Sequence, residues 1–289
     1  MAADPSADDQ RMPFLEHLSE LRIRLRNSVI GVALTTIAAW IFKERLLGLL
    51  ERPLAMAWRN APKDLPPEVN FTNLIDPFMV YFKLALLAGV FGACPVIFHQ
   101  IWKFIAPGLY QKERRLALPF IFTSVLLFAG GGAFAYFYVL PASYSYFLSF
   151  SSSSMDTIQA VSRANGLAMR LRPLLSMDEY FSLTSTLLLM FGAVFELPLI
   201  LAVLAMIGIV TPGGLWRFNR YAILIFFVLG AVLTPGDLVV GQIAMGLSLT
   251  VLYNLSILAA LIVARRRKRE EAAQAADEAK ADEGQAKDE

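Results

Sequence analysis

Six apolar segments constrain the fold of this 289-residue chain more than any other feature of its sequence. A helix that crosses a bilayer needs roughly 20 mostly apolar residues. Segments near this length occupy residues 25–42, 78–98, 116–140, 180–207, 219–233 and 238–263. Only 17% of the residues are charged, compared with about 25% in a typical soluble domain. We therefore predict an all-α membrane protein, with a single domain of six transmembrane helices over residues 1–263.

The distribution of positive charge predicts which side of the membrane each loop occupies. An even number of helices puts both termini on one side. The ends and loops on that side contain fifteen Lys and Arg residues, and the loops on the opposite side contain eight. Because cytoplasmic loops carry the excess of these residues, we predict that both termini are cytoplasmic. The last segment, 264–289, has no aromatic residue and many charged ones, which predicts a disordered cytoplasmic tail.

The stretch 14–24 places charges of both signs directly before the first apolar segment. Its leucines recur at helical spacing, while Glu20, Arg22 and Arg24 point away from that apolar face. This pattern predicts an amphipathic helix at the membrane surface. Glu20 lies about two helical turns outside the bilayer edge. We interpret its carboxylate as a landing site for a basic group.

The connection between the second and third segments is rich in aromatic residues, among them Phe104, which are expected at the level of the lipid headgroups. Glu113 follows at the start of the third segment. One interpretation is that it complements the dipole of that helix at its N-terminus. The other is that Glu113, at the same depth and membrane face as Glu20, forms with it a paired acceptor for guanidinium groups.

Glu196 lies in the middle of an apolar segment, where a charged residue costs about 2.5–3.5 kcal/mol on insertion scales. Pro198 follows two residues later, and a proline frees the carbonyl group four residues before it and favours a kink. Two explanations stay open. A protonated Glu196 donates to the freed carbonyl of Val194, or its carboxylate faces a partner helix or a water-filled concavity.

Further polar or helix-breaking residues lie near the outer ends of the predicted helices. Pro53 interrupts an apolar stripe that we expect to lie along the outer membrane surface. Asp237 suits the N-cap of the sixth helix. Thr234 and Gln242 flank it, and in lipid such groups more often bond across helices than face hydrocarbon. Lys83 is close enough to a helix end for its ammonium group to reach the surface.

The fifth segment is short for a transmembrane helix. Residues 219–233 number 15, which is about 22 Å of helix, against a hydrocarbon core of about 30 Å. The apolar part of the sixth segment, 238–253, is similarly short. We predict that this pair of helices thins the bilayer locally.

Several motifs together resemble the TatC family, the receptor subunit of the twin-arginine protein translocase. They occur in the same order as in that family, at residues 17–24, 104–110, 113–115, 195–198 and 233–237. The resemblance extends from about Phe14 to Leu261. The chain departs from the family pattern at Ser248 and Asn254, where a proline and a glutamate are common.

The resemblance implies a glove-shaped bundle of six helices that recognises folded precursors by a signal peptide with two consecutive arginines. It also implies roles for particular residues. Glu20 and Glu113 bind the arginine pair, and Arg22 and Phe104 belong to the same signal-peptide-binding surface. The other implied roles are the intramembrane concave face for Glu196, the outer face for Pro53 and Asp237, and partner docking for Thr234 and Gln242.

The implied partners are the single-span subunits TatA and TatB, further copies of the chain and the lipid bilayer. The implied location is the bacterial cytoplasmic (inner) membrane. Neither nucleic acid nor a cofactor is expected.

Two other classes of function compete with the receptor. A proton-coupled small-solute transporter would use Glu196 as its proton carrier, but the segments show no evident inverted repeat. A purely structural scaffold does not account for Glu196. Catalysis is not expected, because the sequence contains no nucleophile with its base, no phosphate loop and no metal cluster. The single cysteine, Cys94, excludes an intrachain disulfide.

Overall fold

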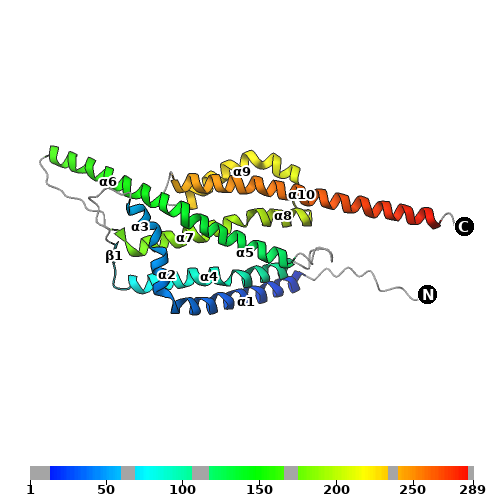
Figure 1. Ribbon diagram of the computed structural model, residues 1–289, viewed down its shortest axis with the longest axis horizontal. Coiled ribbons are helices and arrows are strands. Elements are labelled where there is room, and N and C mark those ends of the chain that lie inside the picture. The colour runs from blue at the N-terminus through cyan, green and yellow to red at the C-terminus, as the bar shows by residue number, and fades with distance from the viewer. Residues whose placement is uncertain (1–13, 60–68, 106–116, 166–174, 234–239, 286–289) are drawn as a thin grey trace.

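The protein is almost entirely helical in the computed structural model, which describes residues 14–59, 69–105, 117–165, 175–233 and 240–285 (Figure 1). The elements are α1 (Phe14–Ile41), α2 (Lys43–Leu50), α3 (Arg52–Arg59), β1 (Val69–Asn70), α4 (Asp76–Ile105), α5 (Ala117–Phe134), η3 (Ala135–Val139), α6 (Leu140–Ala164), β2 (Leu175–Ser176), α7 (Met177–Phe195), α8 (Leu197–Ile207), α9 (Pro212–Leu233) and α10 (Val240–Gln285). The two short strands pair in parallel.

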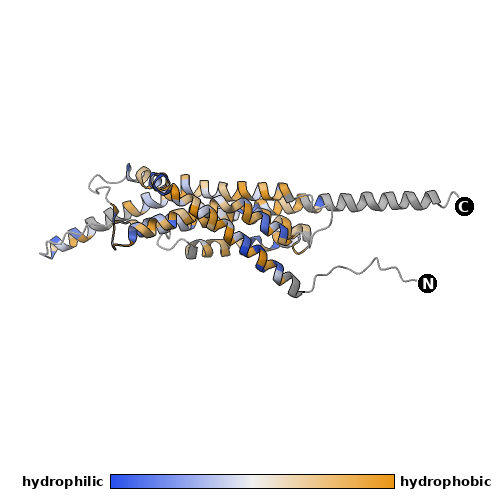
Figure 2. Cartoon of the chain, turned by 90° about the horizontal axis from the view of Figure 1, so that it is seen from below, coloured by the Kyte–Doolittle hydropathy of each residue, from blue (hydrophilic) through white to orange (hydrophobic). Residues whose placement is uncertain are grey.

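Four helical runs among the described residues are long and apolar enough to cross a membrane. They are Asp76–Ile105, Leu118–Ser149, Met177–Met206 and Gln242–Ile262. A fifth candidate is α1 together with α2 and α3, which turn away from it by 85°. Figure 2 shows apolar residues along most of the length of these helices. The all-α membrane class is therefore confirmed, and the count of six spanning helices stays a prediction.

Helices α1 and α4 pack closely because a glycine lies at their interface. A Cβ atom added at Gly89 would lie 2.8 Å from the Cα atom and 2.9 Å from the backbone nitrogen of Thr36. The Thr35 hydroxyl donates a hydrogen bond of 2.7 Å to the Gly89 carbonyl oxygen. Gly31 faces Val96 further along the same pair, so the two helices run antiparallel.

The third predicted segment, 116–140, is wrong at its end, because the helix continues beyond residue 140. A π-helical turn, η3, leads directly into α6, which ends only at Ala164. Pro141 lies at the start of α6. It has no N–H to donate and its ring would clash with the carbonyl four residues earlier. A π-helical turn at this point relieves the clash, since it shifts the hydrogen-bond pattern by one residue.

The helix is interrupted before Pro198, as a proline at this position favours. Helix α7 ends at Phe195 and α8 begins at Leu197, so Glu196 forms the break between them. The chain then turns at Gly208, whose φ of 85° lies in the left-handed region that favours glycine.

The expected start of the fifth helix at residue 219 is wrong. Helix α9 begins at Pro212 and has 22 residues, about 33 Å at 1.5 Å per residue. A proline suits the first turn of a helix because its missing N–H would be unpaired there. The Thr211 hydroxyl accepts a hydrogen bond of 3.2 Å from the Gly214 N–H and so caps this turn. The added first turns contain Arg217 and do not lengthen the apolar part of α9, so local thinning of the bilayer stays a prediction.

The expected disorder of 264–289 differs from the structure, in which α10 continues as a helix to Gln285. The segment is rich in Ala, Glu, Lys and Arg, which are strong helix formers. A scarcity of apolar residues does not prevent helix formation when intrinsic propensity is this high. In Figure 1 α1 begins and α10 leaves the bundle at the same end of the molecule.

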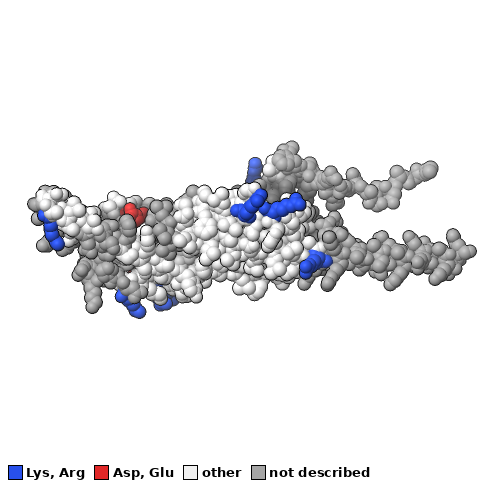
Figure 3. All heavy atoms as spheres, turned by 90° about the horizontal axis from the view of Figure 1, so that it is seen from above, with Lys and Arg blue, Asp and Glu red and all other residues white. Residues whose placement is uncertain are grey.

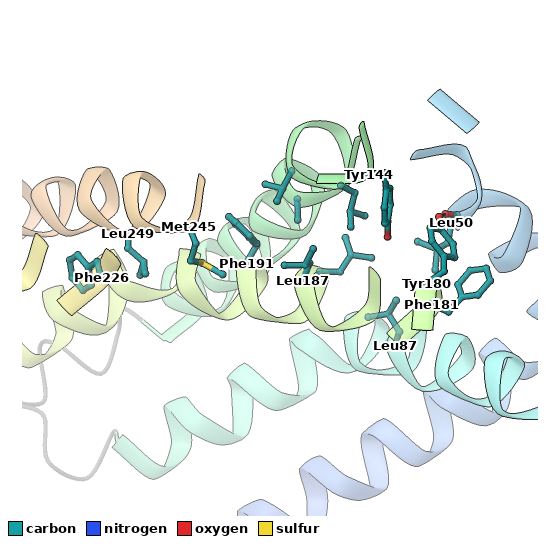
Figure 4. Close-up of a cluster of buried hydrophobic side chains, with 14 of the residues drawn as sticks. Leu50, Leu87, Tyr144, Tyr180, Phe181, Leu187, Phe191, Phe226, Met245 and Leu249 are labelled. Atoms are coloured by element: carbon teal, nitrogen blue, oxygen red, sulfur yellow. The ribbon is translucent and has the colours of Figure 1, made fainter. Parts of the chain in front are cut away.

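The core of the bundle is centred on α7, which contributes more of the large buried side chains than its neighbours. Tyr180, Phe181, Leu187 and Phe191 point from α7 into one cluster of buried side chains (Figure 4). They meet residues from α2, α4, α6 and α10. Helix α7 thus fixes the positions of the helices that carry the candidate functional residues.

Candidate functional site

Glu20 on α1 forms an ion pair with Arg24, one helical turn further along. The Arg24 Nη2 atom donates to Glu20 Oε1 over 2.6 Å, and the side chains are 25% and 18% exposed for Arg24 and Glu20, respectively. The second carboxylate oxygen, Oε2, and the Nε atom of Arg24 are buried and have no hydrogen-bond partner in the described part of the chain. The contact is therefore end-on and leaves much of the hydrogen-bonding capacity of each group unused.

Arg22 and Phe104 lie at the same end of the bundle as Glu20. Arg22 is exposed on α1, and Phe104 is half-buried in the last turn of α4. Because α1 and α4 run antiparallel with Gly31 opposite Val96, Glu20 is level with this last turn. The structure thus brings Glu20, Arg22 and Phe104 to one end of the α1–α4 pair. Glu113 lies outside the described residues.

Glu196 is buried among α4, α5 and α7 in the middle of the bundle, with only 6% of its surface exposed. The Ser124 side chain and the backbone of Phe128 lie beside its carboxyl group. Its Oε1 atom and the Ser124 hydroxyl have no hydrogen-bond partner among the described residues. The structure therefore shows no hydrogen bond from Glu196 Oε1 to the Val194 carbonyl. A buried carboxyl group with an unsatisfied oxygen destabilises the fold.

Pro53 is fully buried in α3, and its effect on the backbone is visible in α2. Proline has no N–H, so it cannot donate to the Leu49 carbonyl oxygen four residues earlier. The Tyr136 hydroxyl of η3 donates to that oxygen instead, over 2.6 Å. The Tyr180 hydroxyl of α7 donates to the neighbouring carbonyl of Leu50. Two tyrosines therefore hold α2 across the end of the bundle opposite the start of α1.

Lys83 joins α4 to α7, a connection that the sequence did not reveal. Its Nζ atom lies 2.6 Å from Asp178 Oδ1 and 2.7 Å from the Ser182 hydroxyl oxygen. The sequence showed that Lys83 is near a helix end and that Asp178 is in the first turn of a later helix. The sequence did not show that these two helix ends are neighbours, so it could not predict the contact between Lys83 and Asp178.

Gln242 at the start of α10 donates a hydrogen bond of 3.3 Å to the Phe227 carbonyl oxygen of α9. This confirms that it bonds across helices. Near the other end of the pair, Asn219 donates to Asn254 over 3.2 Å. Thr234 and Asp237 lie outside the described residues, so their suggested places beside Gln242 stay predictions.

Charged side chains gather towards the two ends of the bundle. On the face shown in Figure 3 the Lys, Arg, Asp and Glu residues lie near the ends, and the described surface between them carries none. Among the described residues no group of three or more His, Cys, Asp or Glu is placed to hold a metal ion. The chemistry at Glu20 suits a guanidinium group, since one carboxylate oxygen already accepts one from Arg24.

Known proteins match the chain over most of its length. A family model described as Sec-independent protein translocase protein (TatC) matches residues 16–247. A TatC protein of Desulforapulum autotrophicum is 42% identical over 274 residues, which cover 94% of this chain and 93% of that protein. A TatC protein of Koribacter versatilis is 37% identical over 266 residues, 91% of each chain.

Solved structures agree with these sequence matches. A crystal structure of the twin-arginine translocase receptor TatC superposes with a TM-score of 0.69 at 33% identity. It covers 86% of this chain and the whole of that one. A second structure of the receptor, in the detergent DDM, gives a TM-score of 0.68 at 34% identity over 84% of this chain and 98% of that one.

Proposed function

The chain belongs to the TatC family of Sec-independent protein translocase proteins, and we propose that its cytoplasmic face binds the arginine pair of twin-arginine signal peptides. It is a multi-pass membrane component of the translocase of the bacterial inner membrane. In this function it is the receptor subunit for folded precursors and the nucleus on which the translocation complex assembles.

The observation that carries the proposal is the Glu20 carboxylate at the end of the α1–α4 pair. One of its oxygens already accepts a guanidinium nitrogen, from Arg24, over 2.6 Å. The local geometry therefore suits the functional group that the signal peptide presents. The planar guanidinium of an arginine can bond a carboxylate through two parallel hydrogen bonds, while the ammonium of a lysine is a point charge.

Other residues complete the recognition surface in this proposal. Glu113 supplies a second carboxylate for the second arginine. Arg22 and Phe104, at the same end of the bundle, support the surface around Glu20. Each exposed ion pair contributes only about 0.2–1 kcal/mol, so the apolar stretch of the signal peptide must contribute much of the remaining affinity.

The remaining sites serve later steps. Glu196 supplies the polar group of the intramembrane concave face, and Pro53 and Asp237 shape the outer end of the bundle. Thr234 and Gln242 form the docking position for the single-span subunits TatA and TatB. The receptor acts without catalysing a reaction, as part of a hetero-complex that contains several copies of the chain, and both of its termini are cytoplasmic.

Site-specific photocrosslinking tests the recognition step. A photoreactive amino acid replaces Phe104, which leaves the Glu20 carboxylate intact, and membranes are exposed to a precursor with Arg-Arg or Lys-Lys. We expect crosslinks with the Arg-Arg precursor and a much lower yield with Lys-Lys. Glu20→Gln in the same background should reduce the Arg-Arg yield. Equal yields for the two precursors would contradict the proposal.

A further inference from the structure

The carboxylate of Glu20 is not free to receive an incoming arginine, because Arg24 bonds one of its oxygens and the other oxygen is buried. Arg24 Nη2 bonds Glu20 Oε1 over 2.6 Å. The other oxygen, Oε2, is buried although it has no hydrogen-bond partner among the residues described. A ligand therefore cannot reach Oε2 unless a neighbouring group moves. Arg24 is the described residue that bonds this carboxylate, so its departure frees Oε1 for an incoming guanidinium group.

The chemistry of the contact favours exchange over permanent pairing. The Arg24 Nε atom is also buried without a partner in the described part of the chain, so the pair does not use the two parallel hydrogen bonds that a guanidinium and a carboxylate can form. Spacing of four residues on one helix brings the two groups together, but gives a weak interaction. An arginine that arrives from outside the helix has no such constraint and can bond side-on.

We propose that Arg24 is an internal occupant of the arginine site, which the signal peptide must displace from Glu20. The inference rests on the proposed function and adds a regulatory step to that site. Binding is then an exchange of one guanidinium for another. Arg24 competes with any cationic peptide for Glu20. A peptide that binds weakly therefore dissociates, and only a peptide that binds more tightly stays bound.

Arg26 provides a matched control on the same helix. It is exposed, lies two residues beyond Arg24, and forms no ion pair with a described carboxylate. Arg24→Gln and Arg26→Gln each remove one positive charge from this end of α1. Only Arg24→Gln also removes the group that bonds Glu20. The difference in peptide affinity between the two variants therefore measures the displacement of Arg24, because both variants lose the same positive charge.

The test is equilibrium binding of a labelled twin-arginine signal peptide to the full-length protein in nanodiscs. We expect Arg24→Gln to bind about two- to fivefold tighter than Arg26→Gln, as an ion pair of this exposure allows. Arg24→Lys should lie between Arg24→Gln and the unmodified protein. A Lys-Lys peptide should gain by the same factor, because the displaced group is the same.

The Glu20→Gln background separates displacement from a structural role of Arg24. If Arg24 acts by occupying Glu20, the gain from Arg24→Gln disappears when Glu20 is already replaced. If Arg24→Gln binds no tighter than Arg26→Gln, or binds more weakly, Arg24 supports the site and the inference is wrong. A Glu20→Gln variant that binds the Arg-Arg peptide normally would instead overturn the proposed function itself.

Discussion

Single residues decide how the end of the bundle at α2 and α3 is held together. Pro53 leaves the Leu49 carbonyl without its usual backbone donor, and the Tyr136 hydroxyl takes that position. The apolar stripe around Pro53 was visible in the sequence. The tyrosine that compensates for the proline, 83 residues later, was not.

The contact between Tyr136 and Leu49 predicts that the effects of Tyr136→Phe and Pro53→Ala on stability are not additive. Tyr136→Phe should lower the free energy of unfolding by about 1 kcal/mol, because it leaves the Leu49 carbonyl without a donor. In a Pro53→Ala background the same change should cost much less, since the alanine that replaces the proline has an N–H that can donate to that carbonyl. Thermal unfolding of the four variants in detergent measures the difference. Equal costs in both backgrounds would show that Tyr136 acts elsewhere.

We predict that replacement of Glu196 has opposite effects on the stability of the protein and on transport. Its carboxyl group is buried and leaves one oxygen unsatisfied, so Glu196→Leu should raise the free energy of unfolding by about 1–3 kcal/mol. Export should fall several-fold, because the polar group is gone. Thermal unfolding and an export assay on the same variant check both effects. Ser124→Ala is the control for the loss of the neighbouring hydroxyl. Reduced stability with normal export would contradict a functional role for Glu196.

Part of this residue-level picture could be predicted and part could not. The break at Glu196 follows from Pro198, a local effect that a sequence records. The pairing of Lys83 with Asp178 depends on which helix ends are neighbours, and the apolar pattern does not contain that information. The contact of Glu20 with Arg24 has a sequence signal in its four-residue spacing, although the sequence pattern was interpreted only as a landing site for a basic group.

At the scale of helices, the close contact of α1 with α4 places Glu20 level with the last turn of α4. It depends on Gly89, where the backbone of Thr36 leaves no space for a side chain. The contact therefore links a small residue inside the membrane to the geometry of the recognition surface at its edge.

Gly89→Ala should push the two helices apart and destabilise the protein by about 1–3 kcal/mol, as overpacking does. The matched control is Gly130→Ala on α5, where an added Cβ meets no atom within 4 Å. That change should be neutral or stabilising by up to about 1 kcal/mol, because alanine favours helices. Thermal unfolding of both variants is the measurement. A Gly89→Ala variant as stable as Gly130→Ala would show that the helices are less tightly packed.

Helix positions were predicted better than helix ends. Each of the six apolar segments lies on a helix over its described residues, because long apolar runs are the strongest sequence signal for membrane helices. The end of the third segment and the start of the fifth helix were wrong, and the sixth helix continues into the charged tail. These features depend on a π-helical turn, a polar first turn and a charged helix, none of which the hydrophobic pattern records.

For the molecule as a whole, the orientation in the membrane is a prediction from its Lys and Arg distribution. In a Cys94→Ala background, the single cysteine of Ala160→Cys should react with a membrane-impermeant maleimide on intact cells. The cysteine of Arg265→Cys should react only after the membrane is opened. These two exposed positions lie on opposite sides in the predicted topology. Labelling of Arg265→Cys on intact cells would reverse the assignment.

The class of the fold and the family could be predicted from the sequence, because both depend on long apolar runs and on motifs that are local. The relative positions of those motifs required the structure. Glu20 and Phe104 are far apart in the chain and share one end of the bundle only because α1 and α4 pack antiparallel.

The central claim is that Glu20 recognises the arginine pair, and a thermodynamic cycle tests it most directly. The affinities of an Arg-Arg and a Lys-Lys signal peptide are measured for the unmodified protein and for Glu20→Gln in nanodiscs. We predict that the unmodified protein prefers Arg-Arg and that Glu20→Gln reduces this preference about two- to fivefold. An unchanged preference in Glu20→Gln would contradict the claim.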